Sequence, residues 1–272
     1  MRFDEAIEGF RRWLELSRAP STARYYVQTV ERFARFCDKK DTDEITLMDV
    51  VNFLGQYRNK RTAAKYAHAL RRFFLFVGRQ DLAYTMPFPR EFKRREPPVL
   101  DEEEIKRAIE RLVDPMERAA IAVAYWCGLR ISELLLLKRE DYDPQAKTIK
   151  VTRVKLKGGA REVQELPVAD WVARHIEAYL GTRRDDDPRM FPVSHEMIRR
   201  MFKRFAKMIG RPDLTFHSLR HARATNLAAQ GHDPATIASW LHHLNPATTM
   251  IYIHLAAKHL RKVLESSIPK EV

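Results

Sequence analysis

Apolar residues recur every three or four positions through the N-terminal part of the chain, which is the spacing of amphipathic helices. The pattern predicts helices over residues 3–14, 26–37, 50–57 and 66–77. Short connections between four such helices favour a compact bundle. We therefore predict a helical N-terminal domain over residues 1–84.

The helical pattern stops at residues 85–98, TMPFPREFKRREPP, where four prolines and several basic residues show no periodicity. Such a composition is typical of an extended linker. Residues 99–272 again follow helical spacing, except that residues 148–168 alternate apolar with polar positions around a Lys-Gly-Gly sequence. That segment predicts a β-hairpin with a glycine turn. The expected fold class is mainly α with a small β-hairpin or sheet.

Three local signals predict where helices begin or end. Ser21 follows Pro20 and is the expected N-cap of the second helix. Asp101 precedes three glutamates and is the expected N-cap of the first helix in the second domain. Gly128 follows a nearly all-apolar helix and is expected to end it in the left-handed conformation.

The charge balance indicates an anionic partner. The formal net charge is +13, and Lys and Arg outnumber Asp and Glu by 20 to 13 in residues 1–97 and by 29 to 23 in the remainder. An excess spread over both domains favours nucleic acid or an acidic membrane surface bound by both. No apolar run reaches transmembrane length, no signal peptide is visible, and both cysteines lie in apolar helical patterns. We expect a cytoplasmic protein that does not enter the membrane.

Basic residues gather around the fourth predicted helix. They are Lys60, Arg61, Lys65, Arg71 and Arg72. A helix N-terminus with nearby cations can bind phosphates, so we expect these residues to contact DNA. The alternative is an ordinary solvated helix face.

Five short segments of the second domain carry side chains suited to phosphate chemistry. They are Gly128-Leu-Arg130-Ile-Ser-Glu133, Lys157-Gly158, His217-Ser-Leu-Arg220-His221, His242-His243 and Tyr252. A phenol oxygen can attack a phosphodiester and hold the phosphate covalently, while cations and histidine donors stabilise the charged transition state. His217 lies one helical turn before Arg220, so both project from one helix face.

In this order and spacing the segments resemble the catalytic domain of the tyrosine recombinases, the integrase and Xer group, which has the DNA breaking-rejoining fold. The N-terminal bundle looks like the SAM-like core-binding domain of that family, so the resemblance covers essentially the whole chain. It implies that Tyr252 is the nucleophile and forms a 3′-phosphotyrosyl link. It also implies that Arg130 and Arg220 bind the non-bridging phosphate oxygens, and that His217 assists proton transfer.

The remaining roles also follow from the resemblance. Glu133 would brace the site, and Lys157 would protonate the leaving 5′-oxygen, although Lys155 could substitute for it. His243 would hydrogen-bond the scissile phosphate. The family usually has glycine where this chain has His242, so His242 could share the role of His243. The other histidines, His221, His254 and His259, are expected to be packing or surface residues.

No cofactor or metal is expected. The chain has no HExxH or CxxC motif and no carboxylate spaced with its histidines as a ligand set, although several histidines lie close together in sequence. No glycine-rich nucleotide loop is present either. A transesterification that stores the bond energy in phosphotyrosine requires neither ATP nor a divalent metal.

The resemblance implies a partner and an assembly. The partner is double-stranded DNA at a specific site, bound by a homotetramer. The C-terminal helix over residues 255–264 would pack into a neighbouring protomer or against its own domain. Xer-like resolution of chromosome or plasmid dimers is favoured. The alternatives are an integrase or excisionase of a mobile element, a type IB-like topoisomerase, and a catalytically silent DNA-binding protein.

Overall fold

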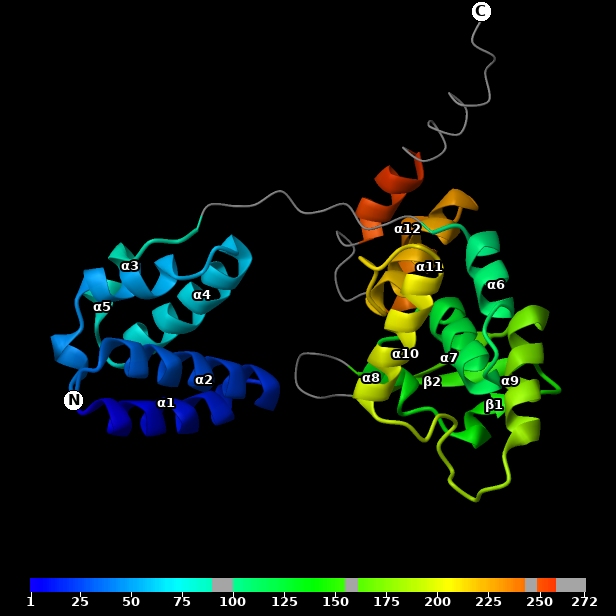
Figure 1. Cartoon of the computed structure of the whole chain (residues 1–272), viewed down its shortest axis with the longest axis horizontal. Helices are drawn as coiled ribbons and strands as arrows, with labels where there is room; N and C mark the ends of the chain where they lie inside the picture. Colours follow the sequence, from blue (N-terminus) through cyan, green and yellow to red (C-terminus); the bar gives the residue numbers. More distant parts are fainter. Residues whose placement is uncertain (90–99, 155–160, 243–248, 258–272) are drawn as a thin grey trace, which may run out of the picture. The chain divides into compact units, whose positions relative to one another are not determined.

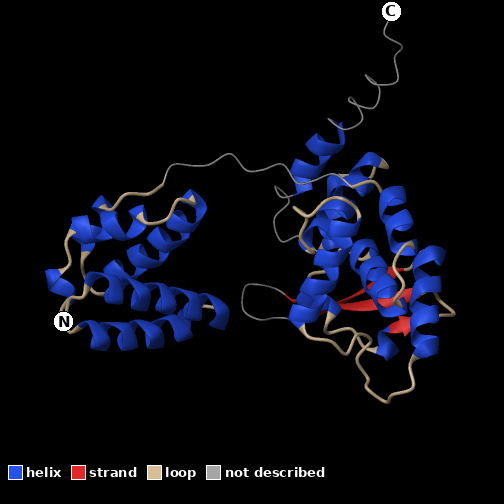
Figure 2. Cartoon of the chain, viewed as in Figure 1, coloured by secondary structure: helices blue, strands red, loops and turns tan. Residues whose placement is uncertain are grey.

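A computed structural model of the chain describes residues 1–89, 100–154, 161–242 and 249–257. The chain divides into two compact units, the first holding the described residues up to 89 and the second those from 100 onward. Both are mainly helical, and the second also contains a small sheet (Figures 1 and 2). The predicted fold class is confirmed. None of the described helices is long and apolar enough to cross a membrane.

The first unit is a bundle of helices. They are α1 (Phe3–Ser17), α2 (Pro20–Cys37), the 3₁₀ turn η1 (Thr42–Glu44), α3 (Leu47–Gly55), α4 (Lys60–Phe76) and α5 (Gln80–Thr85). Its core is aromatic, and the Phe73 ring lies 5.6 Å from Phe3 and 5.4 Å from Phe10 between centroids. The four predicted helices are present. The short helix α5 was not predicted, because six residues are too few for a periodic pattern to appear.

One predicted helix start is wrong. Helix α2 begins at Pro20 with Ala19 as its N-cap, and no side chain caps it. Proline fits the first helical position because its fixed φ suits the helix and its missing N–H has no partner to lose there. The other two signals are confirmed: Asp101 accepts a hydrogen bond from the backbone N–H of Glu103, and Gly128 has a φ of +60°.

The second unit packs helices around a small antiparallel sheet (Figure 1). Its helices are α6 (Glu102–Glu110), α7 (Pro115–Trp126), α8 (Ile131–Leu134), α9 (Asp170–Thr182), α10 (His195–Met208), α11 (His217–Ala229) and α12 (Pro234–Leu241), with the 3₁₀ turn η2 (Arg139–Asp141). Residues 249–257 are also helical. Helix α7 is buried on nearly all sides and forms the centre of the core, as its apolar sequence predicts.

The sheet has the strand order β1 (Tyr142–Asp143), β2 (Thr148–Val154) and β3 (Arg161–Pro167). The predicted hairpin is formed by β2 and β3, which pair from Thr148 opposite Pro167 to Val154 opposite Arg161. Strand β1 was not predicted because it contains two residues.

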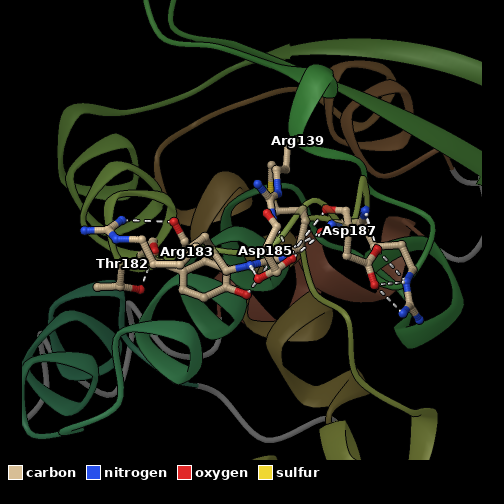
Figure 3. A network of polar contacts seen from close by, with 9 residues as sticks. Arg139, Thr182, Arg183, Asp185 and Asp187 are labelled. Atoms are coloured by element: carbon tan, nitrogen blue, oxygen red, sulfur yellow. Dashed lines mark hydrogen bonds and ion pairs between the residues drawn. The ribbon is translucent and has the colours of Figure 1, made fainter.

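The polar loop between α9 and α10 is held by charged side chains (Figure 3). Arg183 pairs with Asp185 and donates to the backbone oxygens of Arg189 and Met190. Asp185 also accepts from Arg139 at 2.7 Å. This network fixes the loop with ion pairs and backbone hydrogen bonds.

Candidate active site

Helix α11 carries three polar residues of the site, namely His217, Arg220 and His221. Arg220 is 1% exposed, and its guanidinium donates to the backbone oxygens of Gly128, at 2.6 Å, and Leu241. It therefore ties α11 to the ends of α7 and α12. One turn further along, Arg223 lies 3.9 Å from the Trp126 ring centroid and anchors the same helix. Burial lowers the pKa of Arg220, but a guanidinium keeps its charge in proteins.

Gly128 makes this close approach possible. A Cβ at this position would lie 2.2 Å from Cδ2 of Leu241, and the positive φ disfavours side chains as well. The glycine thus allows the end of α7 to meet the end of α12 where Arg220 joins them.

Glu133 on α8 holds Arg130. Its carboxylate accepts the backbone N–H of Arg130 at 2.9 Å and the Arg130 Nη1 at 2.7 Å. Glu133 is fully buried and also lies 3.1 Å from Arg153 and 4.0 Å from Arg220. Burial acts to raise the pKa of Glu133, but the Arg130 N–H and the three arginines outweigh it and lower the pKa. Two guanidiniums predicted to bind phosphate therefore converge on one carboxylate.

His217 is the first residue of α11 and is exposed to solvent. Its ring contacts that of His221 edge-on, with 4.5 Å between centroids. Crowding of the ring by protein, followed by the charges of His221, Arg220 and Arg130, lowers the pKa of His217 to about 4. The pKa of His221 is lowered as well, by burial first and then by Arg220. Both rings are neutral at neutral pH.

Tyr252 lies in the helical segment 249–257 and is 3% exposed. Its ring belongs to a small apolar cluster with Leu227, Ile237 and Leu241. The Tyr252 hydroxyl lies 2.5 Å from Nδ1 of His221, and a neutral Nδ1 without a proton can accept that hydrogen bond. The nucleophile predicted from the sequence is thus covered and held by a histidine.

His221 was missed as a site residue. The residue was expected to be a packing or surface residue, whereas the structure places it against Tyr252. A signal was available, because His217 and His221 are four residues apart and share one helix face. That spacing alone did not identify the residue that this face meets.

Two predicted site residues, Lys157 and His243, lie outside the described residues, as does Lys155. His242 is described, and it ends α12 in the left-handed conformation with a φ of +51°. This conformation is favoured by glycine, which the family usually has at this position. The Nε2 of His242 lies 3.9 Å from the Glu162 carboxylate.

The basic residues of α4 do not form one cluster. Lys60, Arg61 and Lys65 are exposed in its first turns, where Asn59 caps the helix. The other two predicted residues, Arg71 and Arg72, begin about 9 Å beyond Lys65 along the helix axis. There Arg71 stacks over Tyr84 and Phe88, at 5.4 and 5.6 Å, and Arg72 lies over Trp13. Aromatic rings thus hold the second pair in place.

No group of three potential ligands from His, Cys, Asp and Glu gathers to hold a metal among the residues that the structure describes. The polar groups brought together at α8 and α11 are arginines, histidines, one buried carboxylate and a tyrosine. Such a set can bind a phosphodiester, stabilise negative charge on its oxygens and supply a nucleophilic oxygen.

Comparison with known families identifies both units. Residues 98–259 match the phage integrase family, and residues 7–81 match the phage integrase N-terminal SAM-like domain. Similar relatives include the tyrosine recombinase XerA of Thermococcus kodakarensis, which is 31% identical over 97% of this chain and 95% of its own length. The tyrosine recombinase XerC of Thermodesulfovibrio yellowstonii is 26% identical over 97% of this chain and 96% of its own length.

Solved structures of recombinases have the same fold as this chain. A crystal structure of XerA recombinase matches 98% of this chain and 100% of its own, with 27% identity and a TM-score of 0.53. The fold is also that of a lambda integrase dimer bound to a core site, with a TM-score of 0.73 at 18% identity over 93% of this chain and 77% of the other. The chain belongs to the phage integrase family and is an Xer-type tyrosine recombinase, an enzyme that cleaves and rejoins DNA.

Proposed function

We propose that Tyr252 is the nucleophile of this recombinase and that Arg130 and Arg220 bind the scissile phosphate. The observation that carries the proposal is the convergence of both arginines on Glu133, with Tyr252 hydrogen-bonded to the helix that bears Arg220. A planar guanidinium matches the oxygens of a phosphate, and two of them offset the charge that grows in the transition state.

The reaction is a transesterification. The Tyr252 oxygen loses its proton and forms a bond to phosphorus, the bond from phosphorus to the 5′-oxygen breaks, and that oxygen leaves with a proton. Neutral His217, at the open side of the site, is the residue we assign to proton transfer. The resemblance assigns the leaving-group proton to Lys157, a hydrogen bond on the phosphate to His243, and no cofactor.

The proposed nucleophile is covered by protein. Tyr252 is 3% exposed, so its oxygen cannot reach a phosphodiester in bulk DNA without a change at this segment. Arg130 is 30% exposed and can meet a phosphate directly, whereas Arg220 is covered. We infer that binding of the correct duplex uncovers Tyr252, and that this step couples recognition to cleavage.

The substrate we propose is a specific duplex site bound by a homotetramer in the cytoplasm. Two solved relatives support the DNA partner, namely XerH bound to its difH substrate and lambda integrase bound as a dimer to a core site. Full-length similarity to XerA and XerC favours resolution of chromosome or plasmid dimers over integration of a mobile element. The helix predicted over residues 255–264 lies outside the described residues from position 258 onward; its exchange between protomers, which the resemblance implies, would join the tetramer. In the N-terminal domain, Lys60, Arg61 and Lys65 are the proposed phosphate contacts, with Arg71 and Arg72 further along α4.

The test uses a nicked duplex that the protein selects from a random-sequence library. Wild type and Tyr252→Phe are incubated with it in EDTA and resolved on a denaturing gel. We expect a covalent protein–DNA adduct with wild type only. An adduct that persists in the variant would move the nucleophile elsewhere, and tight binding without any adduct would favour a silent DNA-binding protein.

A further inference from the structure

Strand β2 buries an arginine that the proposed mechanism does not use. Ile149, Val151 and Arg153 alternate on its inward face, and all three are fully buried. Arginine is almost never fully buried unless it is paired. A charged residue at the third core position of this strand therefore requires an explanation.

Every nitrogen of the Arg153 guanidinium has an acceptor. Nη1 donates to Oε2 of Glu133 at 3.1 Å, and Nη2 donates to the backbone oxygens of Cys127 and Trp240 at 3.0 and 2.9 Å. Nε donates to Oε1 of Gln164 on β3 at 2.9 Å. One side chain thus joins the sheet, the end of α7, helix α8 and the end of α12.

The contacts of Arg153 run parallel to those of Arg220. Arg220 donates to the backbone oxygens of Gly128 and Leu241, and Arg153 donates to the residue immediately before each of them. Both guanidiniums also face Glu133, the carboxylate that holds Arg130. Arg153 therefore supports, from the side of the sheet, the groups that fix the two proposed phosphate-binding arginines.

Stability alone is a poor explanation for this arrangement. Replacement of a buried ion pair by apolar side chains of similar volume is often neutral or even stabilising, because desolvation offsets the attraction between the charges. What an apolar residue cannot do is hold two helix ends and a carboxylate in one fixed geometry. A shift of about 1 Å in such a support can slow a reaction about 100-fold.

We propose that Arg153 is a positioning residue for DNA cleavage, which orients Glu133 and the ends of α7 and α12 so that Arg130 and Arg220 meet the phosphate. The inference rests on the roles proposed above for Arg130 and Arg220. It predicts a defect in the rate of cleavage while binding of the duplex is retained, because Arg153 itself is too deeply buried to touch DNA.

The experiment measures single-turnover adduct formation at saturating nicked duplex, together with duplex affinity and thermal unfolding. Arg153→Lys keeps a positive charge opposite Glu133, but an ammonium cannot reach both carbonyls in the same geometry. Arg153→Ala leaves a space that methylguanidinium can enter. The matched control is Arg183→Lys, which changes another arginine with a covered side chain that bonds to Tyr179 on α9 and to residues of the loop that follows it (Figure 3).

Arg153→Lys is expected to fold, to bind the duplex like wild type and to form adduct about 100-fold more slowly. Methylguanidinium is expected to accelerate Arg153→Ala and to leave wild type unchanged. Arg183→Lys is expected to melt at a lower temperature but to cleave at the wild-type rate.

Two results would overturn the proposal while leaving the proposed function intact. One is a folded Arg153→Lys protein that cleaves as fast as wild type, and the other is an Arg153→Lys protein that does not fold, which would make the residue a requirement of the fold. If wild type binds the duplex and forms no adduct, the proposed function fails and this inference fails with it.

Discussion

The arginines of the site and its tyrosine are held in different ways. Arg220 is covered and donates to two backbone oxygens, and Arg130 is fixed by both oxygens of a buried glutamate. Tyr252 lies instead in a small apolar cluster, with a hydrogen bond to His221. The two arginines proposed to bind phosphate are thus tied by polar contacts to the ends of α7, α8 and α12, whereas the proposed nucleophile packs against apolar side chains of α11 and α12.

This difference has a chemical consequence. Donors that are fixed before the reaction lower its barrier because no reorganisation is needed as charge develops. A nucleophile that is covered until the substrate arrives cannot attack the wrong phosphodiester. With the proposed roles, the site combines a preorganised phosphate cradle, formed by Arg130 and Arg220, with a protected tyrosine, Tyr252.

The largest effect is expected from Arg220→Lys. A lysine ammonium cannot bond to both the Gly128 and Leu241 oxygens and still present a planar pair of donors to phosphate. Adduct formation should fall about 10²- to 10³-fold, the loss typical of one transition-state donor. Arg223→Lys is the control, because Arg223 lies on the same helix but stacks on Trp126. Equal rates of adduct formation for wild type and Arg220→Lys would show that Arg220 does not bind the phosphate in the transition state.

A smaller loss is expected from Glu133→Gln. The amide keeps the shape of the side chain but turns one acceptor into a donor that faces arginines. Arg130 is then misplaced rather than removed, so cleavage should slow on the order of tenfold. The measurement is the single-turnover rate, with Glu117→Gln as the control, since Glu117 pairs with Arg204 on α10. If only duplex affinity changes, the Glu133 carboxylate contributes to DNA binding and does not position Arg130 for cleavage.

The tyrosine half is tested by a double-mutant cycle in thermal or urea unfolding. His221→Phe leaves the covered Tyr252 hydroxyl without this acceptor, which should lower the free energy of unfolding by about 1–3 kcal/mol. Adding Tyr252→Phe should recover much of that loss, because removal of both partners of a hydrogen bond is nearly neutral. Strictly additive losses would mean that the two residues do not interact in solution.

The smallest effect concerns pH. The pKa of His217 is lowered to about 4, below its ordinary value near 6.5. Between these values the unfolded chain binds more protons than the folded one, so the free energy of unfolding should fall as pH falls from about 6.5. His217→Asn should reduce this slope in urea unfolding between pH 7 and pH 5. An unchanged slope would assign it to other groups, such as His221.

Much of the fold could be predicted because its elements are long and periodic. Helices α1 to α4 of the first unit and the hairpin of β2 and β3 follow from spacing alone. Helix α5 and strand β1 do not, since short elements form only where tertiary packing supports them. Ser21 was misassigned because the proline before it can begin a helix itself.

The site was partly predictable for a different reason. Arg130, Arg220 and Tyr252 belong to short motifs whose order is informative. His221 and Arg153 belong to contacts between distant segments, and the sequence gives no distance between them. A hint for Arg153 was present, because the alternation of β2 places it on the same face as Ile149 and Val151.

The most direct test of the proposed site is to identify the residue to which the DNA becomes covalently joined. The adduct formed on the selected nicked duplex is digested with nuclease and trypsin, and the modified peptide is sequenced by mass spectrometry. We expect a nucleotide joined through its 3′-phosphate to the oxygen of Tyr252 and to no other residue. Attachment at any other side chain would contradict the assignment of Tyr252, and with it the view of this site as a fixed phosphate cradle that faces a protected nucleophile.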